Sequence, residues 1–150
     1  MSKKYVLTDD TIMYSCRTLH RIKALRSFSD VTVGDLGGWI ESEKNLSQKG
    51  DAWIYDDANI CGNALVCGDA KVCGNAEVCG NADYIVFKNF WSSGCYFTWT
   101  RSNNMWRVGC FYGTGEELIK KAYSDSEKSG REYERVVRYV ESILADEKKM

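Results

Sequence analysis

The hydrophobic and polar positions between residues 50 and 85 repeat with a period of six. In sixes, the stretch reads GDAWIY, DDANIC, GNALVC, GDAKVC, GNAEVC and GNADYI. An alanine recurs in each six, and in the first five a β-branched residue follows it two places later: Ala52, Ala58, Ala64, Ala70, Ala76 and Ala82, with Ile54, Ile60, Val66, Val72 and Val78. A fixed short period indicates a repeat architecture, here the hexapeptide parallel β-helix. We expect the alanines and β-branched residues to point inward, and each Gly-Asn or Gly-Asp pair to form a corner.

The six-residue phase is weaker before residue 50. Residues 4–8 are strand-like and precede a predicted turn at Asp9-Asp10. Residues 18–28 fit a helix or a strand, and we favour a strand because the segment leads into the repeats. Residues 31–49 keep the phase imperfectly, with Ser42 and Gln48 at aliphatic positions. We therefore expect an irregular first coil that covers the open end of the repeats.

A different pattern begins after residue 85. Two strand-like runs, residues 95–101 and 105–111, flank Ser102-Asn103-Asn104 and predict a β-hairpin rich in aromatic residues. Capping boxes at residues 114–117 and 129–132 predict two helices, the first to about residue 123 and the second to about residue 147. The second helix carries one apolar stripe, which must be buried against the hairpin or a neighbouring chain.

Several motifs resemble those of a known group of proteins. They are residues 18–22 (TLHRI), 34–41 (GDLGGWIE), 45–48 (NLSQ) and 109–114 (GCFYGT), in addition to the repeats. This set resembles hexapeptide-repeat proteins common in bacteriophage and prophage genomes, and the repeats resemble those of left-handed β-helix proteins. The resulting fold class is mainly β: a short left-handed parallel β-helix with a β-hairpin and two C-terminal helices. The expected domains are a β cap (1–30), the β-helix (31–86) and the hairpin with its helices (87–150).

Composition adds few constraints. The chain has 150 residues, 44% of them hydrophobic and 27% charged, and its net charge is −1. This balance gives no bulk electrostatic reason to bind nucleic acid or an anionic membrane. No apolar run approaches the roughly 20 residues that span a bilayer, and the first residues have no signal-peptide core. We expect a cytoplasmic protein, in an infected bacterium if the phage resemblance holds.

Four of the seven cysteines fall at one phase of successive repeats, namely Cys61, Cys67, Cys73 and Cys79. Consecutive ones lie on different faces of a coil, so they should not converge on one metal ion. Cys61 and Cys79 are 18 residues apart and should stack within disulfide reach, although a reducing cytosol argues against a bond. We read the cysteines as small, semi-apolar fillers, and no metal site or cofactor is predicted.

Two groups of residues are candidates for binding a ligand. The basic run contains Arg21, Lys23 and Arg26, which form either a solvated face or an anion-binding patch. The predicted hairpin carries Trp99, Arg101, Trp106 and Arg107. Its aromatic face either packs over the repeats or stacks on a planar ligand, with an arginine at the ligand's phosphate. These seven residues are the predicted ligand contacts.

Enzymatic function has little support in the sequence. Hexapeptide acyltransferases resemble this chain in their repeats and use a histidine as general base. The single histidine, His20, lies before the repeats, and no loop is inserted into them. We therefore predict a non-catalytic phage accessory protein, a homotrimer that sequesters a small anionic, nucleotide-like ligand to counter host defence. The alternatives are a phage inhibitor that binds a host or defence protein, and an acyltransferase-like enzyme.

Overall fold

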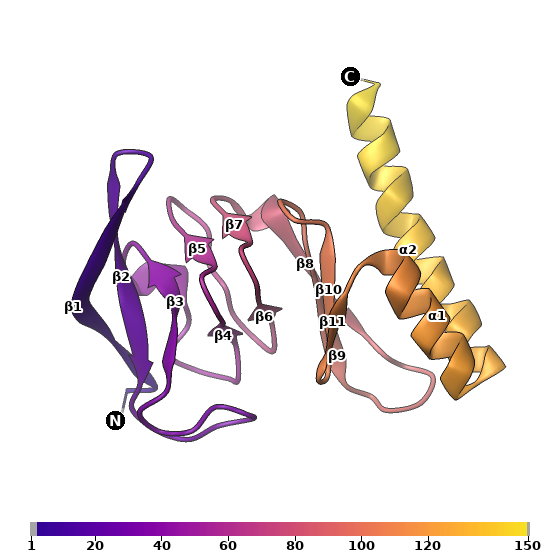
Figure 1. Cartoon of the computed structure of the whole chain (residues 1–150), viewed down its shortest axis with the longest axis horizontal. Helices are drawn as coiled ribbons and strands as arrows, with labels where there is room; N and C mark the ends of the chain where they lie inside the picture. Colours follow the sequence, from indigo (N-terminus) through magenta and orange to yellow (C-terminus); the bar gives the residue numbers. More distant parts are fainter. Residues whose placement is uncertain (1–2, 150) are drawn as a thin grey trace.

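A computed structural model describes residues 3–149 of the chain, which fold into three sheets and two helices (Figure 1). The N-terminal strands and the helices lie at opposite ends of the long axis, and the repeats lie between them. A five-stranded sheet has the order β1-β2-β3-β5-β7, a four-stranded sheet the order β11-β10-β9-β8, and β4 pairs with β6. Short 3-10 helices precede β4 and β8; they are η1 (Glu43–Asn45) and η2 (Asn81–Asp83).

The predicted fold class, a left-handed parallel β-helix with appendages, is wrong. The sheets are mixed: β1 (Tyr5–Tyr14), β2 (Arg17–Ala24) and β3 (Leu36–Ile40) pair antiparallel, whereas β3-β5-β7 and β4-β6 pair in parallel, as does the isolated bridge between Leu46 and Val66. The physical reason is strand length. The repeats supply strands of two residues each: β4 (Trp53–Ile54), β5 (Asn59–Ile60), β6 (Lys71–Val72) and β7 (Glu77–Val78). The longer strands lie outside them and pair antiparallel, and a two-residue turn joins β1 to β2.

The buried positions of the repeats are those that the pattern predicts. The alanines from Ala52 to Ala76 and the β-branched residues from Ile54 to Val78 are all completely buried. Strands 18 residues apart pair in parallel, as Ile54 does with Val72. Ala82 departs from the pattern because it is exposed in η2. Regular packing therefore ends with Val78.

The corners of the repeats require a left-handed backbone. Gly62, Gly68 and Gly74 have φ angles of +64°, +68° and +69°. A residue without a Cβ adopts this conformation without strain, which accounts for the glycine at this phase. Asp56 stands at the corresponding place one repeat earlier and has a φ of +57°; its carboxylate accepts a hydrogen bond from the Gly74 amide at 2.9 Å.

The N-terminal segment is a long hairpin. The strand favoured for residues 18–28 is confirmed in large part by β2. The turn predicted at Asp9-Asp10 is wrong, because β1 continues through both residues with an irregularity in its register. The chain reverses instead at Ser15 and Cys16, whose φ angles are +49° and +65°. Polar residues in mid-strand are tolerated here because one face of the hairpin is exposed.

The C-terminal part is a sheet covered by two helices. The predicted hairpin is confirmed as β9 (Tyr96–Thr100) and β10 (Met105–Val108), and β8 (Tyr84–Lys88) and β11 (Phe111–Gly113) complete the sheet. The helices are α1 (Gly115–Asp125) and α2 (Glu127–Lys148). The first capping box is confirmed at Thr114 and Glu117. The second is wrong: Ser126 caps α2, and the Ser129 amide donates to its hydroxyl.

A second core joins the helices to this sheet. It contains Phe97, Trp99 and Trp106 from the strands, packed with Leu118 of α1 and Val137 of α2. The apolar stripe of α2 is thus buried against the chain's own sheet. The two indole rings are 6.4 Å apart between centroids and are 0% and 1% exposed.

Candidate functional site

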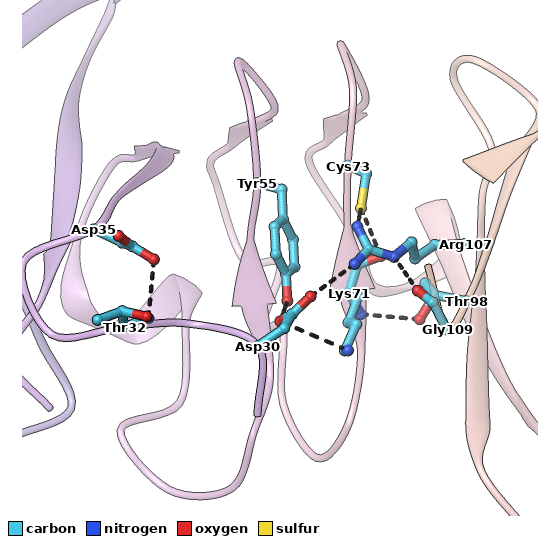
Figure 2. A network of polar contacts seen from close by, with 9 residues as sticks. All are labelled: Asp30, Thr32, Asp35, Tyr55, Lys71, Cys73, Thr98, Arg107 and Gly109. Atoms are coloured by element: carbon cyan, nitrogen blue, oxygen red, sulfur yellow. Dashed lines mark hydrogen bonds and ion pairs between the residues drawn. The ribbon is translucent and has the colours of Figure 1, made fainter. Parts of the chain in front are cut away.

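The side chain of Arg107 leaves β10 and enters a cluster of polar groups from three parts of the chain (Figure 2). Its Nη2 lies 2.9 Å from Asp30 Oδ2, its Nη1 donates to Cys73 Sγ at 3.2 Å, and its Nε donates to the Gly109 carbonyl at 2.6 Å. The guanidinium also lies over the Tyr55 ring, 4.7 Å from its centroid. This arginine therefore ties the C-terminal sheet to the repeats and to the loop before β3.

Asp30 is the common partner in this cluster. Tyr55 donates a hydrogen bond of 2.6 Å to its Oδ1, and Lys71 Nζ lies 3.8 Å from the same oxygen. Burial by itself would raise the pKa of the Asp30 carboxyl, but the Tyr55 hydrogen bond and the charges of Lys71 and Arg107 hold it below its usual value. Asp30 is thus a carboxylate at neutral pH, placed between two cations.

The other two polar groups of the cluster are uncharged at neutral pH. Burial, followed by the hydrogen bond to Asp30, raises the pKa of the Tyr55 hydroxyl. Burial raises the pKa of the Cys73 thiol to about 11, although Arg107 acts in the opposite direction. A buried thiol of this kind is a poor nucleophile, since the thiolate is the reactive form. We name Asp30, Tyr55, Lys71, Cys73 and Arg107 the Arg107 cluster.

An open groove adjoins the cluster. One hollow of about 230 Å³ is lined by Lys71 and Tyr96, and a neighbouring hollow of about 560 Å³ shares Asp69 and Tyr96 with it. We call the two together the Tyr96 groove. Its remaining lining residues come from the loop before β3, the corners of the repeats, the start of β8 and the start of β9: Ser29, Asp51, Cys67, Gly68, Asn81, Tyr84, Ile85, Val86 and Cys95.

The structure does not bring the seven predicted ligand contacts together. Arg107 lies in the cluster just described, whereas Trp99 and Trp106 are covered in the second core. Arg101 forms ion pairs with Glu147 of α2 and Asp83 of η2. The two indole rings offer no free face for stacking in this arrangement.

The basic run on β2 is partly neutralised. Arg21 stacks on Trp39 with 4.3 Å between the guanidinium carbon and the ring centroid, and its Nη2 lies 3.1 Å from Asp57. Arg26 lies over Phe28 at 5.4 Å, and Lys23 is exposed. A ligand-binding role for Arg21, Lys23, Arg26, Trp99, Arg101 and Trp106 stays a prediction.

Sequence reasoning missed four members of the Arg107 cluster. Lys71 had a visible signal, because it is the single basic residue between residues 50 and 85, among several acidic ones. Asp30, Tyr55 and Cys73 had none, because nothing in their spacing connects them with one another or with residue 107. Only the stacking of the repeats beside the C-terminal sheet places them together.

His20 lies outside the groove's lining, on β2. Its Nδ1 is 3.0 Å from the Thr8 carbonyl oxygen. Because a carbonyl only accepts, Nδ1 carries the proton in this contact and leaves Nε2 of the neutral ring as an acceptor. The ring is half-buried. This tautomer is the one that a general base acting through Nε2 requires.

Among residues 3–149, no three His, Cys, Asp or Glu side chains are grouped closely enough to hold a metal ion. In the same part of the chain, neither helix has the length and apolar character needed to cross a bilayer.

Comparison with known proteins gives one partial similarity. No family model matches the chain. A curated relative, the uncharacterised acetyltransferase YdcK of Escherichia coli (strain K12), is 37% identical over 62 residues. The match takes in 36% of this chain and 19% of that protein's length. A part of this chain is therefore similar to a part of an acetyltransferase.

Proposed function

We propose that this chain is a non-catalytic binding protein that holds a small anionic, nucleotide-like molecule at the Arg107 cluster and the Tyr96 groove. One observation carries the proposal: Arg107 of β10 and Lys71 of β6 converge on a single carboxylate, and Lys71 also lines the groove. Two cations beside one Asp30 leave a net positive charge in the cluster. A phosphate group could neutralise it by lying beside Asp30 or by taking its place.

The walls of the groove suit a molecule with more than one kind of group. Tyr96 is 46% exposed, so part of its ring is free to stack on a planar base. Lys88 Nζ lies 5.8 Å from that ring's centroid and adds a further cation. Asp51 and Asp69 line the hollow that contains Lys71. These carboxylates disfavour a purely anionic ligand and favour one that also donates hydrogen bonds, as the exocyclic amino group of a nucleobase does.

The test is titration calorimetry with inorganic phosphate, nucleoside monophosphates, cyclic nucleotides and unphosphorylated nucleosides. We expect phosphorylated compounds to bind and Lys71→Gln to weaken them about tenfold or more, because a hydrogen bond to a charged group is worth roughly 1.5–3 kcal/mol. Asp30→Asn should tighten binding, since it removes the internal anion that competes for the two cations. Lys120→Gln on the exposed side of α1 is the matched control and should change nothing.

Two results of these titrations would contradict the proposed anion site. If phosphorylated and unphosphorylated compounds bind alike, or if Lys71→Gln and Lys120→Gln behave identically, the cluster is no anion site. In that case Arg107, Asp30 and Tyr55 serve only to join the segments.

Acyl transfer is the second candidate function. Two observations favour it: the partial similarity to an acetyltransferase, and the His20 tautomer that leaves Nε2 free. An assay would follow thiol release from acetyl-coenzyme A in the presence of mixed amine and alcohol acceptors. Transfer that is present in the wild type and abolished in His20→Gln would establish this function. Absence of transfer with every acceptor would favour the binding function.

We also propose the setting that the phage resemblance suggests: a homotrimer in the cytoplasm of an infected bacterium, where the chain counters host defence. Native mass spectrometry tests the assembly. A trimer that gains a discrete small mass from a nucleotide extract supports sequestration. A trimer that stays bare and instead retains a host protein supports the inhibitor alternative, and a monomer removes the basis for a site shared between subunits.

A further inference from the structure

Two thiols from different repeats are in contact. β5 and β7 pair in parallel with Ile60 opposite Val78, and the next amide, that of Cys61, donates to the Val78 carbonyl at 3.0 Å. Cys61 and Cys79 therefore face each other across the strand pair, and their sulfurs lie 3.0 Å apart.

We propose that Cys61 and Cys79 are a site of reversible thiol–disulfide exchange, which a small-molecule disulfide converts into a covalent cross-link between β5 and β7. This inference is independent of the proposed ligand-binding function.

The backbone already has a geometry that a disulfide needs. A disulfide spans Cα atoms about 4.4–6.8 Å apart, and neighbouring strands are spaced about 4.8 Å apart. The sulfurs need to approach by only about 1 Å to reach the bond length of roughly 2.05 Å. Rotation about the side-chain bonds supplies such a movement, so the strands can keep their register.

The two thiols differ in access, and the difference sets the order of reaction. Cys79 is exposed, whereas Cys61 is 2% exposed and packs with Leu19 and Trp39 beneath the N-terminal hairpin. A small disulfide therefore meets Cys79 first. Burial, followed by the contact with Cys79, raises the pKa of the Cys61 thiol to about 12, while Arg17 acts in the opposite direction. Cys61 is thus protected from external reagents and is reached through its partner.

The exchange is balanced when glutathione disulfide is the oxidant. The Cys79 thiolate attacks one sulfur of the oxidant, breaks its S–S bond and releases one glutathione thiolate. Cys61 then gives its proton to solvent and attacks Cys79 Sγ. That step forms the Cys61–Cys79 bond, breaks the mixed disulfide and releases the second glutathione thiolate. Two protein thiols are oxidised, and one disulfide is reduced to two thiols.

The other five cysteines serve as internal controls. Cys73 is buried and bonded to Arg107, while Cys16, Cys67, Cys95 and Cys110 are exposed. Among the seven thiols, all of which lie within residues 3–149, Cys61 and Cys79 are the pair whose sulfurs are in contact. Cys67 lies at the same phase one repeat after Cys61 and, like Cys79, is exposed, so it is the matched control.

The experiment treats the full-length chain with glutathione redox buffers of graded ratio, blocks free thiols with N-ethylmaleimide and maps the peptides by mass spectrometry. We expect the wild type to lose two hydrogens and to yield one peptide pair linked through Cys61 and Cys79, reversibly with excess reduced glutathione. Cys67→Ser should give the same cross-link. Cys61→Ser should instead accumulate one glutathione on Cys79, because the second step has no attacking thiol.

A persistent glutathione adduct on Cys79 in the wild type, with Cys61 still free, would overturn the proposal. So would a predominant link from Cys79 to any other cysteine. The wild-type peptide map decides the matter even if Cys61→Ser folds poorly. As a second measurement, oxidation should raise the thermal unfolding midpoint of the wild type and of Cys67→Ser.

Discussion

Lys4 is a buried cation, and among residues 3–149 its ammonium group donates to backbone carbonyls and to no carboxylate. Its Nζ donates to the Ala52 carbonyl at 2.7 Å and lies 5.1 Å from the Phe28 ring centroid. Burial lowers the pKa of Lys4 from 10.5 to about 8, and the charge of Arg26 acts in the same direction. The folded chain therefore carries a penalty for the charged form, which deprotonation removes.

This penalty predicts how stability changes with pH. Between pH 8 and 10.5 the unfolded chain binds more protons at Lys4 than the folded chain, so folding gains stability as the pH rises. Lys4→Met carries no such charge. Urea unfolding should show that the unfolding free energy of the wild type, minus that of Lys4→Met, increases from about pH 7 to pH 9.5. Other titrating groups are common to both proteins and cancel. A constant or falling difference would contradict the assigned pKa.

Val72 tests the inward phase of the repeats. Its side chain is completely buried between alanines and other β-branched residues. Val72→Asp places a carboxylate there without a partner, which should cost several kcal/mol and unfold the repeats. Val33→Asp is the matched control, because Val33 is 58% exposed and should change stability by less than about 0.5 kcal/mol. Circular dichroism during thermal unfolding would show a folded Val72→Asp if the phase were wrong.

At the level of elements, the two glycines in β3 are explained by close approach. A Cβ on Gly38 would lie 2.7 Å from the Ala58 carbonyl oxygen and 2.5 Å from Ile54 Cγ2. This carbonyl oxygen belongs to the backbone and accepts a hydrogen bond from the Trp39 amide, so it cannot move away without weakening that bond. The glycines of the motif at residues 34–41 thus meet a packing requirement in β3.

Gly38→Ala should therefore destabilise the chain by about 1–3 kcal/mol, the usual cost of overpacking. Gly80→Ala is the matched control: a Cβ there meets nothing within 4 Å, and its φ of −150° suits any residue. Denaturant unfolding of both variants decides the question. Equal stability of the two would mean that β3 can move away from the repeats without cost.

Local patterns predicted the elements better than their ends. The strand-like run at residues 95–101 and the capping box at Thr114 each depend on a few neighbouring residues, and the strand and the cap are both observed. The observed cap of α2, Ser126, lies three residues before the predicted one, Ser129. Both are serines, so the side chain alone does not distinguish them. The Asp9-Asp10 turn does not form because β1 pairs with β2 on both sides of the two aspartates, which lie in an irregularity of the register.

On the scale of the whole molecule, the sequence predicted which residues are buried but not how the sheets are built. The six-residue period by itself identifies the inward residues of the repeats. The antiparallel pairing of β1, β2 and β3 depends on contacts between segments that have no repeating pattern. The Arg107 cluster has the same origin. It joins positions 30, 55, 71, 73 and 107, and only Arg107 was among the predicted ligand contacts.

The ion pair between Asp30 and Arg107 is the contact that joins the loop before β3 to β10, across 77 positions of sequence. Asp30 is 46% and Arg107 15% exposed in their side chains, so solvent screens the pair in part. A double-mutant cycle with Asp30→Asn and Arg107→Gln should give a coupling energy of about 1 kcal/mol in urea unfolding. The control cycle combines Asp30→Asn with Lys120→Gln, which share no polar partner, and should be additive within about 0.5 kcal/mol. If the first cycle is also additive, Arg107 contributes to stability through its stacking on Tyr55 and its bond to Gly109, and the loop carrying Asp30 is free to make way for a bound anion.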